Sequence, residues 1–423
     1  MTLAGDMEPA VLLPISILRE GNLTFDEFVH ADEPLPFWFR HRNGHVVSAY
    51  PIIPGLLNVP AFALAHIHFL PRDIVKDRHA LSMITTVFIA AGAVVLFYFC
   101  LLQVVRRKEA VIFFTLTYAF ATNVWSTASR GLWQHGPSLL FLNGALLILF
   151  AKKERWFPLA GILTGLLVWN RPTNIVFALA ISMFVLWKYP KRALKFFAPA
   201  ACVAFLFFIY SMEYQGSLLA FGQGQPYAWF NGSILNNIPA LLISPGRGLF
   251  IYTPLFLLAF PACWILIQRF RDETETLILL LTLALIPFFF IYGKWGTWWG
   301  GNVFGYRIIT EVCTPLMLLI VLLWRFPKRS SKVLNIILGC TLFWSFAVQY
   351  IGVVRYPLCE TGPEKRAQYD HPERFWNIGE AQLVRCIERF YSSKDSYQQA
   401  VFPAWTIQEE RKQLQSADLP ELQ

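Results

Sequence analysis

Two carboxylates near the start of the chain, Asp6 and Glu8, are separated by a single residue and could carry out chemistry. Carboxylates at this spacing can coordinate a divalent cation, or one of them can act as a general base toward a hydroxyl group. Two solvated acids would show the same pattern, so the pair alone does not decide between these alternatives. A divalent cation is one candidate cofactor, and the sequence assigns no metal ligand.

Cationic residues lie in polar segments that are rich in Gly, Pro and Trp. Arg247 lies between two glycines in the turn 244–248. Glycine lets the backbone approach an anion closely, and the guanidinium suits a phosphate. No Gly-Lys-Ser/Thr follows, so the turn is not a nucleotide-binding P-loop. Lys294 and Arg307 bracket a segment of Trp and Gly residues, which is typical of an interfacial anchor or of a shaped pocket.

Four further candidates lie in or beside short polar breaks between apolar runs. Arg171 interrupts a long apolar run, and a cation at membrane depth is costly unless it meets an anion. His135 could carry a proton, hydrogen-bond to an anion or cap the helix that follows, and Arg130 lies in the same break. Tyr50 precedes an apolar stretch, 52–70, whose prolines favour a helix in the membrane interface over a full crossing.

The elements that must position these residues are membrane-spanning helices. Of the 423 residues, 56% are hydrophobic and 15% are charged, whereas soluble domains average about 25% charged. The run 157–187 is broken by polar residues at 170–174 and predicts two short crossings, because a single helix would bury Arg171 near the midplane. We expect an all-α polytopic membrane protein with about ten crossings of the ~30 Å hydrocarbon layer. The other expected crossings are 81–105, 111–126, 137–151, 196–212, 248–268, 276–292, 308–324 and 333–353.

Basic residues in alternate loops predict the orientation in the membrane, because loops rich in Lys and Arg stay in the cytoplasm. These loops are 106–108, 152–155, 188–195, 269–271 and 325–332. The predicted organisation is an exported first loop with interfacial helices (1–79), a transmembrane domain (80–353) and a small exported tail (354–423). The net charge of +9 therefore reflects membrane orientation, and nucleic acid is not expected as a partner.

This topology brings five cationic side chains to the exported leaflet. Anionic lipid headgroups alone could account for such a ring. A site for a phosphate-bearing lipid, faced by the acids of the first loop, accounts for the carboxylates as well, and we prefer this interpretation. The five cations are Arg130, Arg171, Arg247, Lys294 and Arg307.

Both ends of the chain carry further expectations. No hydrophobic segment precedes residue 11, and export of the first loop requires one, so we expect another hydrophobic helix upstream. Cys359 and Cys386 fall in the exported tail, where a disulfide is permitted, and two unpaired thiols fit the sequence equally well.

The ordered set of motifs resembles the GT-C superfamily of membrane glycosyltransferases, particularly the bacterial relatives of protein O-mannosyltransferases and aminoarabinose transferases. The resemblance covers nearly the whole chain. The motifs that carry it are the acid pair Asp6/Glu8 and the segments 48–55, 132–137, 170–173, 244–252, 298–301 with 305–307, and 374–377.

This resemblance implies a transferase of the bacterial inner membrane, with its site on the periplasmic side. The enzyme would pass a sugar from a polyprenyl-phosphate donor to an acceptor by one inverting displacement. Asp6 would be the catalytic carboxylate, Glu8 would help hold the acceptor or a metal, and Arg247 and Arg307 would hold the donor phosphate. The remaining candidates for substrate binding are Arg130, His135, Arg171, Lys294 and Tyr50.

Two other classes of function are compatible with the sequence. A transporter or flippase of a lipid-linked or anionic solute predicts internal repeats and intramembrane acids in broken helices. No internal repeat is evident, and Glu311 is the main acid inside a long crossing. A non-catalytic protein of envelope assembly is the third class. Neither the sugar nor the acceptor follows from the sequence.

Overall fold

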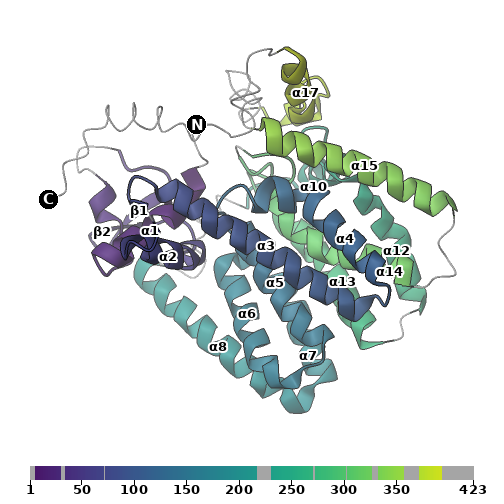
Figure 1. Ribbon diagram of the computed structural model, residues 1–423, viewed down its shortest axis with the longest axis horizontal. Helices are drawn as coiled ribbons and strands as arrows, with labels where there is room; N and C mark the ends of the chain where they lie inside the picture. Colours follow the sequence, from purple (N-terminus) through teal and green to yellow (C-terminus); the bar gives the residue numbers. More distant parts are fainter. Residues whose placement is uncertain are drawn as a thin grey trace.

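The computed structural model describes residues 5–29, 34–70, 72–216, 230–269, 272–301, 303–325, 332–356 and 371–392. Within these ranges the chain is mostly helical (Figure 1). The two strands, β1 (Phe39–Arg42) and β2 (His45–Ser48), pair as an antiparallel hairpin with Phe39 opposite Ser48. The architecture agrees with the all-α class expected from the sequence.

Within the described ranges, five helical segments are long and apolar enough to cross a membrane, as expected of a membrane protein. They are α3 (Arg78–Val104), Pro190–Gln215 around α8 (Ala193–Tyr210), α13 (Glu273–Gly293), Arg307–Arg325 and α15 (Lys332–Arg355). Other apolar helices, including α5 (His135–Phe150) and α10 (Ile234–Ile243), are shorter. The figure of about ten crossings stays a prediction.

The helix α14 (Cys313–Arg325) lies at the centre of the bundle and α8 lies at its edge. The most apolar window of Arg307–Arg325 is 94% buried, whereas that of the α8 segment is only 17% buried. Leu194 and Phe205 of α8 are largely exposed, as expected of side chains that face lipid.

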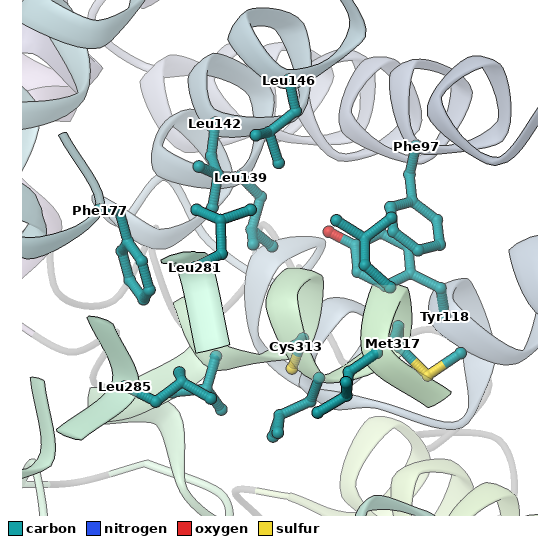
Figure 2. Packing of buried hydrophobic residues seen from close by; sticks show 14 of the residues in the cluster. Phe97, Tyr118, Leu139, Leu142, Leu146, Phe177, Leu281, Leu285, Cys313 and Met317 are labelled. Atoms are coloured by element: carbon teal, nitrogen blue, oxygen red, sulfur yellow. The ribbon is translucent and has the colours of Figure 1, made fainter. Parts of the chain in front are cut away.

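The core around α14 is built from large apolar side chains of several helices. Figure 2 shows Leu139 and Leu142 of α5, Leu281 of α13 and Met317 of α14 among its members. Tyr118, near the end of α4 (Lys108–Phe120), contributes a polar contact, because its hydroxyl lies 3.1 Å from Oγ1 of Thr314. Packing in this core therefore fixes the position of α14 within the bundle, and with it the position of the residues Arg307–Val312 that precede α14.

The predicted interruption of 157–187 is confirmed. Helix α6 (Phe157–Asn170) is followed by Arg171, whose backbone is extended (φ −153°, ψ 100°). A residue that precedes proline is driven out of the helical conformation, which explains the break at this point. The chain continues through the short turn Pro172–Asn174 into α7 (Ile175–Lys188).

The structure corrects two of the expected crossings, and the first of them, 248–268, is not a continuous helix. It consists of α11 (Leu249–Tyr252), a 3-10 turn (Pro254–Leu258) and α12 (Ala259–Arg269). Thr253, which like Arg171 precedes a proline, lies outside the helical conformation (φ −140°, ψ 71°), and the hydrophobic run concealed this break. The expected crossing 111–126 is likewise interrupted, since α4 ends at Phe120 and a π-helical turn covers Val124–Ala128.

The N-terminal segment packs against the bundle through α1 (Glu8–Arg19) and α2 (Ile53–His66). The side-chain amide of Asn58 in α2 donates hydrogen bonds to the carbonyl of Ala10 (3.2 Å) and to Oγ of Ser82 in α3 (2.8 Å). Helix α2 has 14 residues, fewer than the roughly 20 of a full membrane span, and its position in the membrane interface stays a prediction.

The C-terminal segment contains the turn η12 (Pro372–Trp376) and α17 (Gln382–Ser392), which packs against α15 (Figure 1). Cys386 in α17 is disulfide-bonded. Cys359 lies outside the described residues.

Loops that the charge pattern assigned to one side of the membrane meet at one end of the bundle. Lys152, which follows α5, bonds to Glu273 at the start of α13 (2.6 Å). Arg325, which ends α14, bonds to Asp272 (2.6 Å). Helix α5 runs from this end to His135 at the other, so the acid pair and the basic loops lie at opposite ends. That the basic end faces the cytoplasm stays a prediction.

Glycine permits the close approach of α6 and α8. A Cβ atom on Gly161 would lie 2.0 Å from the carbonyl oxygen of Phe196, and one on Gly165 would lie 2.8 Å from Cβ of Val203. Small residues four positions apart allow this kind of helix packing in membranes.

We predict that Gly161→Ala destabilises the bundle by about 1–3 kcal/mol, because the added methyl group meets backbone rather than a movable side chain. The matched control is Gly339→Ala in α15, where an added Cβ meets nothing within 4 Å. Thermal unfolding in detergent should show a lower midpoint for Gly161→Ala alone. Equal midpoints for the two variants would contradict the packing described.

Candidate functional site

Asp6 is held by donors from two distant parts of the chain. It lies in the turn Gly5–Met7 that leads into α1. One carboxylate oxygen accepts a hydrogen bond from Nη2 of Arg307 (2.6 Å), and the other accepts one from Nε1 of Trp133 (3.0 Å). The side chain of Asp6 is only 20% exposed, so the carboxylate is not a solvated surface group. The predicted meeting of the first loop with a guanidinium is therefore present.

Arg307 begins the segment that continues into α14, and its side chain is 10% exposed. Its guanidinium lies over the indole of Trp133, 4.8 Å from the ring centroid. Besides Asp6, Nη2 reaches the carbonyl of Gly300 (3.2 Å). The Nε and Nη1 groups are buried and have no hydrogen-bond partner in the part of the chain that the structure describes. Buried donors of this kind are costly to leave unpaired and suit an incoming oxyanion.

The loop before Arg307 depends on glycine. Gly300 and Gly301 both have φ +75°, a left-handed conformation that glycine adopts without strain. Gly305 has φ +58°, and a Cβ there would lie 2.9 Å from the ring of Tyr252. These turns direct carbonyl groups of the loop toward two arginines. The Gly- and Trp-rich segment is thus a shaped part of the site.

A second cluster of charges lies directly beside the first. Nη1 of Arg171 contacts both carboxylate oxygens of Glu311 (2.7 Å each), and Nη2 donates to the carbonyl of Ile308 (2.6 Å). Glu311 is fully buried, and the ring of Tyr292 lies 5.3 Å from the Arg171 guanidinium. A charge pair of this kind neutralises two ions that the apolar interior could not hold singly.

His135 completes the second cluster. Its Nδ1 lies 2.7 Å from Nη1 of Arg171 and 3.1 Å from Oε1 of Glu311. One nitrogen cannot both accept from Arg171 and donate to Glu311, so the protonation of His135 decides which contact is a hydrogen bond. His135 is thereby placed in a buried network at the start of α5, where the sequence left its role open.

Sequence reasoning did not assign Glu311 to the site. The available signal was an acid inside a long apolar crossing and an arginine at similar depth, since each requires a partner. Arg171 also holds the backbone of Ile308, which directly follows Arg307. The second cluster therefore supports the position of Arg307.

Arg247 lies in a different set of contacts. It is 2% exposed, and Nη1 donates to the carbonyl of Val303 and to Oε1 of Gln382 (2.8 Å), while Nη2 reaches the carbonyl of Gly301 (3.2 Å). Asp6 thus meets Arg307 and not Arg247. The guanidinium of Arg247 donates to oxygens of the protein itself. The contact of Arg247 with a donor phosphate that the sequence led us to expect stays a prediction.

The other candidates differ in how closely they approach the site. Burial raises the pKa of the Tyr50 phenol, and the nearby negative charge of Asp6 raises it further, while the positive charge of Arg307 acts in the opposite direction. The phenol is therefore a hydrogen-bond donor at neutral pH. Burial lowers the pKa of Arg130, which has no hydrogen-bond partner among the described side chains and stays protonated. Lys294 is exposed at the end of α13.

The two acids of the Asp6/Glu8 pair do not converge on one point. Asp6 faces Arg307, whereas Oε1 of Glu8 lies 3.8 Å from Nε2 of His79. Across the described ranges, no group of three or more His, Cys, Asp or Glu side chains could hold a metal ion. The residues present do not fit the divalent cation considered from the sequence.

Comparison with known proteins adds no family, because neither a protein-family model nor a curated protein matches the chain. The roles assigned to individual residues therefore rest on the contacts described above and on the resemblance of the motifs.

We predict that Arg171→Met or Glu311→Met alone costs about 3–5 kcal/mol, because each leaves an uncompensated buried charge. The double variant removes both charges and should be markedly more stable than the sum of the single effects predicts. Thermal unfolding of the four proteins in detergent measures this coupling. Additive effects would show that the two side chains do not depend on each other.

Proposed function

We propose that the chain is a membrane glycosyltransferase that moves a sugar from a polyprenyl-phosphate donor to an extracytoplasmic acceptor. The acceptor would be a lipid, a glycan or a protein. The observation that carries this proposal is the largely buried contact of Asp6 with Arg307, whose Nε and Nη1 groups have no hydrogen-bond partner among the described residues. A carboxylate and an anion-binding cation side by side are what this transfer requires.

The unpaired donors of Arg307 support a phosphate ligand in particular. A guanidinium offers several N–H groups in fixed directions, and phosphate oxygens accept them well. The polyprenyl chain of the donor would lie in the bilayer against the apolar helices. Within the site, the donor phosphate would compete with Asp6 for Arg307 and release the carboxylate toward the acceptor.

The proposed reaction is a single displacement. The acceptor hydroxyl oxygen attacks the anomeric carbon, while the bond from that carbon to the phosphate oxygen breaks and its electron pair leaves with the phosphate. Asp6 takes the hydroxyl proton, and the anomeric configuration inverts. Arg307 compensates the charge that develops on the leaving phosphate, in a poorly hydrated setting where such compensation is strong.

The proposal places the reaction at the exported face of the bacterial inner membrane, in a bundle of about ten crossings. The separation of Asp6 and Arg307 from the basic loops at the other end of α5 supports this orientation. Tyr50 and Arg130 would contact the substrate, and Glu8 would help hold the acceptor.

One observation favours transport as the second candidate function. Glu311 is a buried acid in a 3-10 segment whose residue Ile309 departs from helical geometry (φ −116°, ψ 25°). Interrupted helices with buried ionisable groups are typical of transporters. Vesicles that move a lipid-linked or anionic solute without transferring sugar would favour this alternative.

We predict that Asp6→Asn lowers sugar transfer by about 10³-fold or more, because the amide cannot accept the acceptor proton. The assay follows transfer from a polyprenyl-phosphate sugar in membranes that contain equal amounts of each protein. Glu27→Gln is the control, since it removes an exposed acid from the same N-terminal segment. Unchanged transfer by Asp6→Asn would rule out the assigned role.

We predict that Arg307→Lys lowers kcat/KM for the donor by about 10²-fold, because the ammonium keeps the charge and loses the planar set of donors. Arg307→Gln should lower it further, since both the charge and the geometry are lost. Equal activities of the two variants would show that the charge of Arg307 does not act on the donor.

A further inference from the structure

The C-terminal segment 371–392 holds the glycine loop that precedes Arg307. It makes this contact through two buried residues, Phe375 in η12 and Gln382 at the start of α17 (1% and 2% exposed). Neither residue stood out as a site residue in the sequence. Both reach the loops that carry Arg247 and Arg307.

Gln382 uses both ends of its side-chain amide. Its oxygen accepts hydrogen bonds from Nη1 of Arg247 (2.8 Å) and from the backbone N–H of Gly305 (2.9 Å). Its nitrogen donates to the carbonyl of Val303 (2.7 Å). One side chain thus satisfies two backbone groups of the loop and one guanidinium, all away from water.

Phe375 fills the space between the same two loops. Its ring packs against the indoles of Trp298 (centroids 5.4 Å apart) and Trp299 (5.7 Å), and the Arg247 guanidinium lies 5.6 Å from its centroid. Its backbone carbonyl accepts from the N–H of Gly246 (3.0 Å). A Cβ on Gly246 would lie 2.8 Å from the ring, so the glycine of this turn is needed for the contact.

The loop held in this way sets the surroundings of Arg307. Its residue Gly300 accepts a hydrogen bond from Arg307, and Gly305 lies two positions before Arg307 in the chain. We propose that Gln382 and Phe375 are positioning residues, through which the C-terminal segment fixes the loop and orients the Arg307 guanidinium. Arg247 acts here as the link between the tail and the loop. The functional part of this inference rests on the proposed function; the conformational part does not.

A covalent constraint adds to these contacts. Cys386, one turn after Gln382 in α17, is fully buried and disulfide-bonded. The helix that supplies Gln382 is therefore held by a crosslink as well as by packing against α15.

Hydrogen exchange of the full-length protein in detergent, read by mass spectrometry, tests the conformational part. In Gln382→Ala, peptides that cover 303–307 should exchange about tenfold faster than in the wild type. Gln382→Glu keeps the two accepted hydrogen bonds and loses only the donated one, so its increase should be smaller. Glu388→Ala, an exposed change in the same helix, is the control and should leave these peptides unchanged.

Activity measurements test the functional part separately. Gln382→Ala should raise KM for the donor with a smaller effect on kcat, and Gln382→Glu should restore part of the loss. Unaltered exchange in both Gln382 variants would overturn the positioning role. Faster exchange combined with unaltered donor KM would overturn its link to Arg307. If the wild-type protein transfers no sugar while exchange responds as expected, the proposed function fails and the conformational role stands.

Discussion

Two buried contacts between arginine and carboxylate organise the functional end of this protein. A charge in an apolar interior is tolerated only with a partner close by, so Arg171 must meet Glu311 and Arg307 must meet Asp6. The first pair joins the residue that follows α6 to the 3-10 segment Arg307–Val312, which precedes α14. The second pair joins the same 3-10 segment to the N-terminal segment.

The two pairs have different chemical characters. Arg171 and Glu311 satisfy each other and are almost completely enclosed, which suits a structural role. Arg307 has buried donors that find no partner within the described ranges, and Asp6 keeps some exposure, which suits exchange with a ligand. The C-terminal segment 371–392 adds a further support, because it holds the loop that contacts Arg307. The chemistry proposed for this end would therefore depend on the N-terminal segment and on the segment 371–392.

Much of this arrangement could be predicted from residue type and spacing. Arg171 ahead of a proline predicts a helix break, and alternating basic loops predict which polar segments share an end of the bundle. Other features depend on local backbone conformation, which the spacing of hydrophobic residues in the sequence does not reveal. The break at Thr253 lies inside an unbroken apolar run, and Arg247 and Arg307 look equivalent until the tail is in place. The pairing of Glu311 with Arg171 could not be predicted, because it depends on how deeply α14 packs in the bundle.

The most direct test of the central claim is a structure of the protein with a polyprenyl-phosphate sugar bound in a lipid nanodisc. The account predicts the phosphate within hydrogen-bond distance of Nε or Nη1 of Arg307, with the anomeric carbon facing Asp6. A donor phosphate bound elsewhere, with the Asp6–Arg307 contact still closed, would contradict it.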